Sequence, residues 1–89
     1  MADLVIASFL IGRGDDCDVR VQDEYANKHH ARVHVLFDGS AYVEDLGATN
    51  PIYVVRGTQR WKVRMNSAIS PGDVLLIGRT PITWNGVPQ

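Results

Sequence analysis

Three short polar segments of this 89-residue chain carry the side chains best suited to binding an anion. They are Gly12-Arg13, residues 27–30 and residues 45–50, and together they offer a guanidinium, an ammonium, side-chain amides and a hydroxyl. Such donors suit a phosphate dianion, which carries about −1.5 to −2 charges and three strong acceptor oxygens. Because loops at one end of a β-sandwich often converge on a binding surface, we expect the three segments to meet there.

The elements that would position these segments are β-strands. Short runs of Val, Ile, Tyr, Phe, Trp and Thr are broken by Gly, Pro, Asn and Asp at about every eight to twelve residues, a pattern typical of an all-β sandwich or barrel. No segment has a pattern that favours a helix. We expect nine strands, at residues 4–7, 9–12, 18–21, 31–37, 41–44, 52–55, 59–63, 73–77 and 80–84.

The strand expected at residues 31–37 shows the clearest alternation. Val33, Val35 and Phe37 alternate with Arg32, His34 and Leu36, so the first set is expected to face the core and the second mainly water. Asp38-Gly39 then predicts a hairpin into the next strand. Residues 70–73, Ser-Pro-Gly-Asp, predict a second tight turn.

Composition and charge exclude several classes of protein. The chain is 45% hydrophobic and 21% charged with a formal charge of −1, which indicates one globular domain, residues 1–89, and gives little attraction for a nucleic-acid backbone. Cys17 has no second cysteine to pair with, and no secretion signal is recognisable. No apolar stretch approaches the roughly 20 residues of a membrane span. We therefore expect a cytoplasmic protein that binds neither membrane nor nucleic acid.

The order of four segments resembles the forkhead-associated (FHA) domain family. The segments are Ile11-Gly12-Arg13, residues 27–33, residues 44–50 and residues 71–78. The family pattern is Gly-Arg, then Ser-x-x-His, then a loop similar to Asp-Leu-Gly-Ser-Thr-Asn-Gly. The resemblance implies an FHA-like antiparallel β-sandwich, here of about nine to eleven strands, that binds a phosphothreonine-containing protein or peptide through loops at one end.

The resemblance also implies roles for five residues of a phosphopeptide site. Arg13 would contact the phosphate and Lys28 would lie at the edge of the site. Asn27 stands where the family usually has Ser. Thr49 would donate its hydroxyl to the phosphate, and Asn50 would bind the ligand's backbone.

Two further residues, Gly12 and His30, are expected to support the site, with His30 bracing the binding loop. A shifted alignment that places Ala26 at the Ser position and His29 at the His position has the same spacing. The alignment that ends at His30 is preferred because His30-Ala31 continues into the next strand as in the family.

Two positions depart from the family pattern. Asn27 can still donate a hydrogen bond but is larger than Ser, so we expect a reduced affinity for phosphate. Pro51 replaces the usual Gly after Asn50, lacks an N–H and restricts Asn50 to extended conformations. These departures favour an alternative function, a phosphoindependent interaction or assembly domain on the same scaffold.

Other interpretations of the same residues remain open at this point. Arg13 could form an exposed ion pair with Asp15 or Asp16, and Thr49 and Asn50 could be ordinary turn residues whose side chains bind nearby backbone groups. The three histidines have no carboxylate or thiol at a recognisable metal-ligand spacing. No nucleophile, base and orienting group stand out either. We expect no enzyme activity, no metal and no cofactor.

Overall fold

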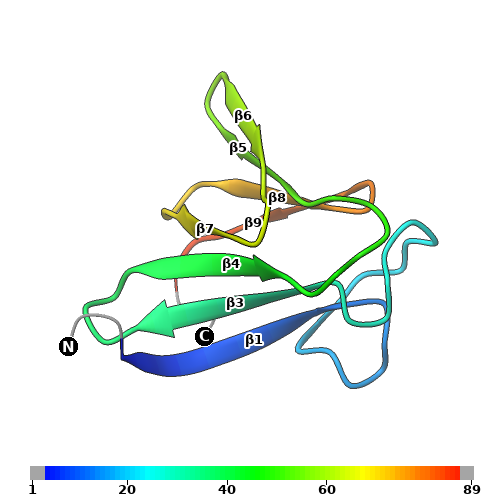
Figure 1. Cartoon of the computed structure of the whole chain (residues 1–89), viewed down its shortest axis with the longest axis horizontal. Helices are drawn as coiled ribbons and strands as arrows, with labels where there is room; N and C mark the ends of the chain where they lie inside the picture. The colour runs from blue at the N-terminus through cyan, green and yellow to red at the C-terminus, as the bar shows by residue number, and fades with distance from the viewer. Residues whose placement is uncertain (1–3, 87–89) are drawn as a thin grey trace.

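Nine β-strands in two packed sheets form the described part of the chain, residues 4–86 of the computed structural model, and this part contains no helix. The strands are β1 Val5–Gly12, β2 Val19–Arg20, β3 Ala31–Leu36, β4 Ala41–Asp45, β5 Tyr53–Arg56, β6 Gln59–Lys62, β7 Asn66–Ile69, β8 Val74–Ile77 and β9 Thr80–Thr83. One sheet has the order β2-β1-β3-β4-β7 and the other β6-β5-β8-β9, and all pairings except β1–β2 are antiparallel. The expected β-sandwich is confirmed (Figure 1).

The core forms where the inner faces of the two sheets meet, because alternate residues of each strand point inward. In β3, Ala31, Val33 and Val35 are buried while the residues between them are half-buried. Val54 and Leu75 lie opposite each other in the second sheet, and both are fully buried. The hydrophobic core contains Ile11, Val21, Ala26, Ala31, Val33, Val35, Ala41, Val43, Ile52, Val54, Val63, Ile69, Leu75, Ile77 and Trp84.

Both predicted turns are present. The β3–β4 turn is closed by a hydrogen bond from the Gly39 N–H to the Leu36 carbonyl, at 2.9 Å. In the turn before β8, the Asp73 N–H donates to the Ser70 carbonyl at 3.0 Å.

Three expectations about the strands were wrong. Residues 4–7 and 9–12 belong to one strand, β1, because Ser8 continues the ladder opposite His34 and a register shift lies between Val5 and Ala7. The strand β7 was not predicted, because Asn, Ser and Ala have low β-propensity and this strand lies at a sheet edge. Phe37 does not face the core: it follows the last residue of β3 and is 68% exposed.

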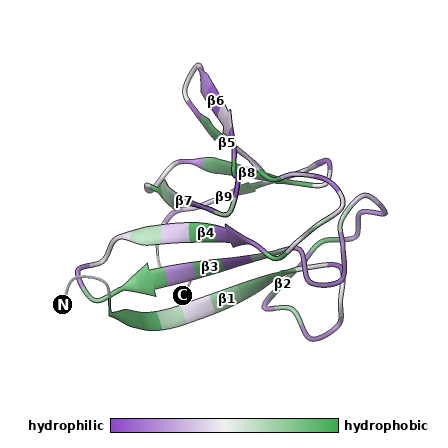
Figure 2. Ribbon diagram, viewed as in Figure 1, coloured by the Kyte–Doolittle hydropathy of each residue, from purple (hydrophilic) through white to green (hydrophobic). Residues whose placement is uncertain are grey.

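The two ends of the sandwich differ in chemistry. At one end lie the β3–β4 hairpin and the start of β1, where Leu4, Ile6 and Phe37 are exposed, and the first half of β1 is coloured hydrophobic in Figure 2. At the other end lie the β1–β2, β2–β3, β4–β5 and β8–β9 connections (Figure 1). The three polar segments of the sequence are all at this second end.

Candidate functional site

The Gly12-Arg13 segment is held against the β2–β3 loop by its backbone. The Arg13 N–H donates to the Asn27 carbonyl at 2.9 Å, and the Gly14 N–H donates to the Lys28 carbonyl at 3.0 Å. A Cβ at position 12 would collide with that Lys28 carbonyl, so only glycine allows this approach of the two backbones. Gly12 therefore lies where the two segments approach most closely, and Arg13 is held beside residues 27 and 28.

The Arg13 side chain reaches the same loop. Its Nε–H donates to the Ala26 carbonyl at 3.0 Å, and its exposed terminal NH₂ groups form no ion pair with a described residue. The two carboxylates proposed as partners are engaged elsewhere, Asp15 with Arg20 at 3.0 Å and Asp16 with His29 at 2.8 Å. The ion-pair interpretation of Arg13 was therefore wrong.

The loop after β4 is folded by its first residue. One carboxylate oxygen of Asp45 accepts the N–H groups of Gly47 and Ala48, both at 2.9 Å, and Gly47 has a φ of 83°, which favours glycine. The turn presents Thr49 and Asn50 to the β2–β3 loop.

Two contacts join the two loops. The Thr49 N–H donates to the Asn27 Oδ1 at 3.3 Å, and the Asn50 Nδ2 donates to the Tyr25 carbonyl at 2.8 Å. The interpretation as turn residues is thus half correct: the Asn50 amide satisfies a backbone carbonyl, but the Thr49 hydroxyl has no hydrogen-bond partner among residues 4–86.

His30 lies in the core beneath the loops, with no exposed surface. Its Nδ1 accepts the Asn27 N–H at 3.0 Å, so the proton of the neutral ring is on Nε2, which is buried and has no hydrogen-bond partner in the described part of the chain. Burial lowers the pKa of His30, although the nearby Asp45 carboxylate opposes that shift. His29 is exposed and bound to Asp16, so the buried position belongs to the alignment that ends at His30.

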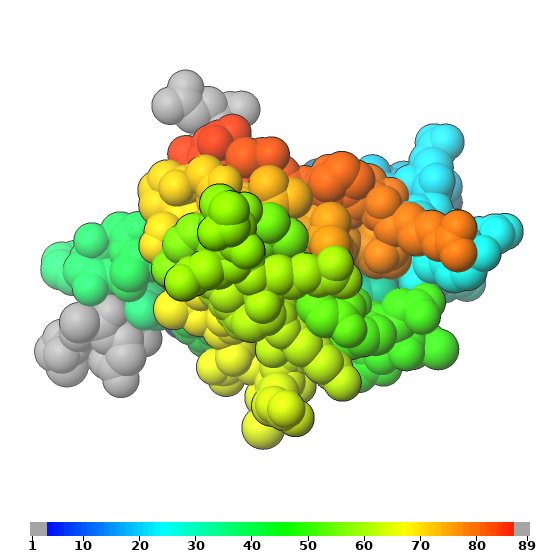
Figure 3. All heavy atoms as spheres, turned by 90° about the horizontal axis from the view of Figure 1, so that it is seen from above, coloured from blue at the N-terminus to red at the C-terminus, as the bar shows by residue number. Residues whose placement is uncertain are grey.

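The loops enclose an open cleft of about 600 Å³. Figure 3 shows the chain around residues 21–30 in cyan beside the orange β8–β9 turn, with the green loop after β4 at the same end of the molecule. The structure brings all five expected binding residues together here, and two further lining residues, Glu24 and Tyr25, were missed because they belong to no motif. The cleft is lined by Arg13, Glu24, Tyr25, Ala26, Asn27, Lys28, His29, Thr49 and Asn50.

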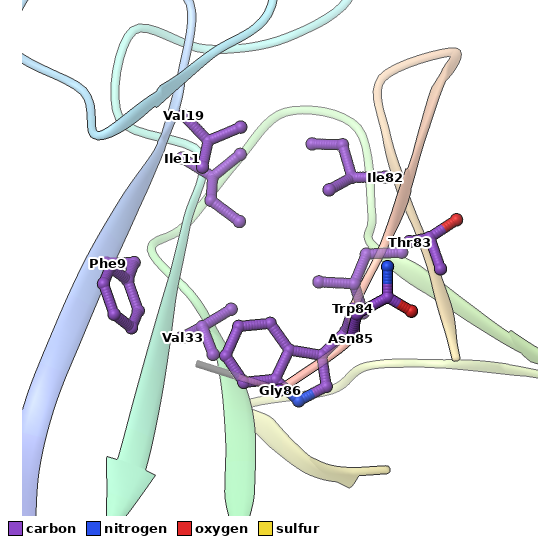
Figure 4. Close-up of a pocket in the computed structure, with 10 residues that line it drawn as sticks. Phe9, Ile11, Val19, Val33, Ile82, Thr83, Trp84, Asn85 and Gly86 are labelled. Carbon is purple, nitrogen blue, oxygen red and sulfur yellow. The ribbon is translucent and has the colours of Figure 1, made fainter. Parts of the chain in front are cut away.

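A second, apolar cavity of about 450 Å³ lies between the sheets, beside β1 and β9. Figure 4 shows Phe9, Val33 and Trp84 around it, and the rings of Phe9 and Trp84 lie 6.3 Å apart. None of its lining residues is charged. It therefore lacks the cationic side chains that favour binding of a phosphate.

A serine, a histidine and an acid do lie in one hydrogen-bonded row, which the sequence did not predict. The His34 Nδ1 lies 2.9 Å from the Ser8 hydroxyl and its Nε2 lies 2.8 Å from the Glu44 carboxylate. The row runs across neighbouring strands β1, β3 and β4, and none of the three residues lines either the site cleft or the apolar cavity. Neither of these two clefts could therefore hold a substrate against the row.

Two kinds of feature are absent from the described part of the chain. Residues 4–86 contain no group of three or more His, Cys, Asp or Glu side chains placed to hold a metal ion. They also contain no helix long and apolar enough to cross a membrane.

Known proteins similar to this chain share both the sequence pattern and the fold. It is 42% identical over 74 residues to the FHA domain-containing protein FhaB of Mycobacterium tuberculosis, which covers 82% of this chain and 44% of FhaB, so the chain spans less than half of that relative. The FHA domain of CT664 from Chlamydia trachomatis superposes with a TM-score of 0.74 at 26% identity, over 84% of this chain and 71% of that one. A structure described as a structural and functional analysis of phosphothreonine-dependent FHA domain interactions gives a TM-score of 0.68 at 30% identity, over 97% and 83%.

The family model of the FHA domain matches residues 9–78. This range contains the Gly12-Arg13 segment, the β2–β3 loop and the loop after β4. The chain therefore belongs to the FHA domain family.

Proposed function

We propose that this domain binds phosphothreonine segments of other proteins in the cleft between the β2–β3 loop and the loop after β4, and that it acts as a binding module rather than an enzyme. One observation carries the proposal. Four donor groups line the cleft without an acceptor among the described residues: the terminal NH₂ groups of Arg13, the Lys28 ammonium, the Thr49 hydroxyl and the Asn27 Nδ2.

These donors match the ligand because a phosphate dianion offers several acceptor oxygens in a small volume. Arg13 supplies a planar fork and Lys28 a point charge, while Thr49 and Asn27 supply neutral donors. The side-chain nitrogen of Asn50 already donates to the Tyr25 carbonyl, so Asn50 is not counted among the phosphate donors. We assign it to the ligand's backbone at the rim of the cleft. The similar structure described by its phosphothreonine-dependent interactions supports this choice of ligand.

The two departures from the family pattern are compatible with this function. The amide of Asn27 uses its oxygen to hold the Thr49 N–H, which leaves its nitrogen for the ligand. Asn50 makes its contact with Tyr25 although Pro51 follows it. The two departures therefore do not speak against phosphate binding, and the phosphoindependent alternative is not the favoured one.

The proposal extends to the setting of the domain. Cys17 is a free cysteine, and the site residues need neither a metal nor a cofactor to bind phosphate. We place the protein in the cytoplasm, with residues 1–89 as one domain and a phosphorylated protein as its partner.

Peptide binding measured by calorimetry or fluorescence anisotropy tests this function. A degenerate phosphothreonine library is compared with matched phosphoserine and unphosphorylated libraries. We expect binding of the phosphothreonine library alone, and its affinity is expected to fall about 100-fold in Arg13→Ala because a charge-assisted bidentate contact is removed.

The matched control is Arg64→Ala, which removes an exposed arginine that lines none of the clefts described above. It is expected to bind like the wild type. Equal binding of the phosphorylated and unphosphorylated libraries, or unchanged binding by Arg13→Ala, contradicts the proposal.

A further inference from the structure

A second cleft opens beside the first. It has a volume of about 340 Å³ and shares two lining residues, Tyr25 and Asn50, with the site cleft. Its other walls come from the start of β5, from β6 and from the β8–β9 turn. Because the clefts share a wall, one extended peptide can occupy both. The second cleft is lined by Tyr25, Asn50, Pro51, Tyr53, Arg60, Leu76, Gly78 and Arg79.

Two arginines in this cleft are stacked on tyrosines. The Arg79 guanidinium lies 4.0 Å from the centroid of the Tyr25 ring, and the Arg60 guanidinium lies 4.4 Å from that of Tyr53. Stacking holds a planar guanidinium against an aromatic face and leaves its edge N–H groups free to donate. The cleft therefore presents two oriented sets of donors.

Neither arginine forms an ion pair with a described residue, in contrast to Arg20 with Asp15 and Arg56 with Asp73. None of the residues that line the second cleft is acidic. The two stacked guanidiniums are thus available for an anion from outside the chain.

Asp23 is the carboxylate that faces this region, and its oxygens are already used. It accepts the Tyr25 N–H at 2.8 Å, the Arg79 N–H at 2.7 Å and the Thr80 hydroxyl at 2.8 Å. These hydrogen bonds, together with the charge of Arg79, lower the pKa of Asp23, so the carboxylate stays ionised near neutral pH. Asp23 anchors the β8–β9 turn below Tyr25 and offsets part of the charge of Arg79, but it does not bind the guanidinium.

We propose that this second cleft binds a further anionic side chain of the same phosphothreonine peptide, through Arg60 and Arg79. The ligand is thus an acidic phosphopeptide, with a carboxylate or a second phosphate near the phosphothreonine. The proposal rests on the proposed function, because it takes the phosphothreonine itself to occupy the first cleft.

The test uses a parent peptide with one phosphothreonine in an uncharged background. In a first series a single aspartate is moved through the five positions on each side of the phosphothreonine, and in a second series a second phosphothreonine replaces it. Affinities are measured for the wild type, Arg60→Gln, Arg79→Gln and the double variant. The matched control is Arg64→Gln, which removes the same charge elsewhere on the surface.

The quantity that decides is the ratio of the affinity for the acidic peptide to that for the parent peptide in the same protein. We expect a ratio of about 5 at the best position in the wild type and in Arg64→Gln, since an exposed ion pair contributes up to about 1 kcal/mol. In the double variant the ratio is expected to fall to about 1. A gain in the aspartate series assigns the cleft to a carboxylate, and a gain only in the second series assigns it to a phosphate.

Failure of this inference is distinguishable from failure of the proposed function. If the parent peptide binds only when phosphorylated but neither series gains affinity, the second cleft is not an anion site. The same holds if the gain persists in the double variant. If the parent peptide does not bind in preference to its unphosphorylated form, the proposed function fails and this inference fails with it.

Discussion

Arg13 and Arg56 have the same side chain in opposite circumstances. Arg56 in β5 donates its Nε–H and one terminal NH₂ to the two oxygens of Asp73, at 2.9 and 2.8 Å, and the side chain of Asp73 is only 3% exposed. The guanidinium also lies 5.0 Å from the centroid of the Trp61 ring. Arg13 gives one hydrogen bond to a backbone carbonyl and has no acidic partner among the described residues.

The difference shows that the hydrogen-bond partners of a guanidinium determine whether it stabilises the fold or remains available for a ligand. Asp73 also accepts the Ser70 N–H at 2.8 Å, so the Arg56 pair secures the turn before β8. Hydrogen bonds from Arg56 lower the pKa of Asp73 against the opposing effect of burial. The donors of Arg56 are therefore used within the fold, whereas those of Arg13 are free for a ligand.

The largest expected effect on stability comes from Asp73→Ala. We expect the free energy of unfolding to fall by about 2 kcal/mol, because a buried carboxylate that satisfies Arg56 and the Ser70 N–H is lost. Peptide affinity is expected to change less than about twofold. Urea unfolding and anisotropy measure the two quantities.

Arg13→Ala is expected to have the opposite effect and to lower peptide affinity but not stability. Its free energy of unfolding is expected to stay within about 0.5 kcal/mol of the wild type. If Arg13→Ala destabilises the fold as much as Asp73→Ala, the contrast between the two arginines is wrong.

The free energy of unfolding at acidic pH gives a second check of the Arg56–Asp73 pair. The pKa of Asp73 is lower in the folded state than its ordinary value of 3.8, so its contribution is present above that value and is lost as pH falls through the folded pKa. Asp73→Ala is expected to lack this loss.

This contrast also separates what the sequence could predict from what it could not. Arg13, Asn27 and Thr49 were predicted as neighbours because each lies in a motif whose order along the chain is recognisable. The Arg56–Asp73 pair joins residues 17 positions apart that belong to no motif. Nothing in the local pattern indicates such a pair, because it depends on the antiparallel register of β5 and β8, in which Val55 pairs with Val74.

Strand ends and cleft walls were also predicted only in part, because they too depend on contacts between residues far apart in the sequence. Alternation predicted β3 well, but Phe37 continues the pattern one residue beyond the strand and is exposed. Ser8 looked like a break between two strands, yet it occupies an outward position of β1 opposite His34. Tyr25 lines both clefts, and this was not predictable because its role depends on contacts with Asn50 and Arg79 from distant loops.

Arg13→Lys sharpens the comparison with a smaller change. It keeps the charge but loses the planar fork and the anchoring bond from Nε to the Ala26 carbonyl. We expect phosphothreonine peptide affinity to fall about tenfold, less than for Arg13→Ala. Lys28→Arg is the matched exchange in the opposite direction, and it is expected to change affinity less than about threefold because Lys28 acts as a point charge. Equal affinities for Arg13→Lys and the wild type would show that charge alone is required.

The loop beside Arg13 is held by the neutral His30 ring, which accepts the Asn27 N–H, whereas Arg56 is held by its ion pair with Asp73. The two interactions are expected to respond differently to pH. The pKa of His30 is lowered from its ordinary value of 6.5 by burial. The unfolded chain therefore takes up a proton first, and the stability present above 6.5 is lost as pH falls through the folded pKa. We expect the free energy of unfolding to decrease as pH falls below about 6.5.

His30→Asn tests this origin, because Asn offers an oxygen to the Asn27 N–H but does not titrate. We expect a weaker dependence on pH in this variant than in the wild type. The pairs His29–Asp16 and His34–Glu44 are unchanged in both proteins, so they do not contribute to the difference. The same decrease in both proteins would assign the pH dependence to other groups.

The smallest expected effect comes from Glu24→Gln. Glu24 is the one acidic residue among those that line the site cleft, and it is exposed. Its charge repels the incoming phosphate, but water and salt screen that repulsion, so removing it is expected to raise affinity only about twofold at low salt. The gain is expected to vanish at about 0.5 M salt, where the Debye length is short. Weaker binding by Glu24→Gln would instead indicate that Glu24 accepts a hydrogen bond from the peptide, and the cleft would then use a carboxylate for its ligand as well as the cations of Arg13 and Lys28.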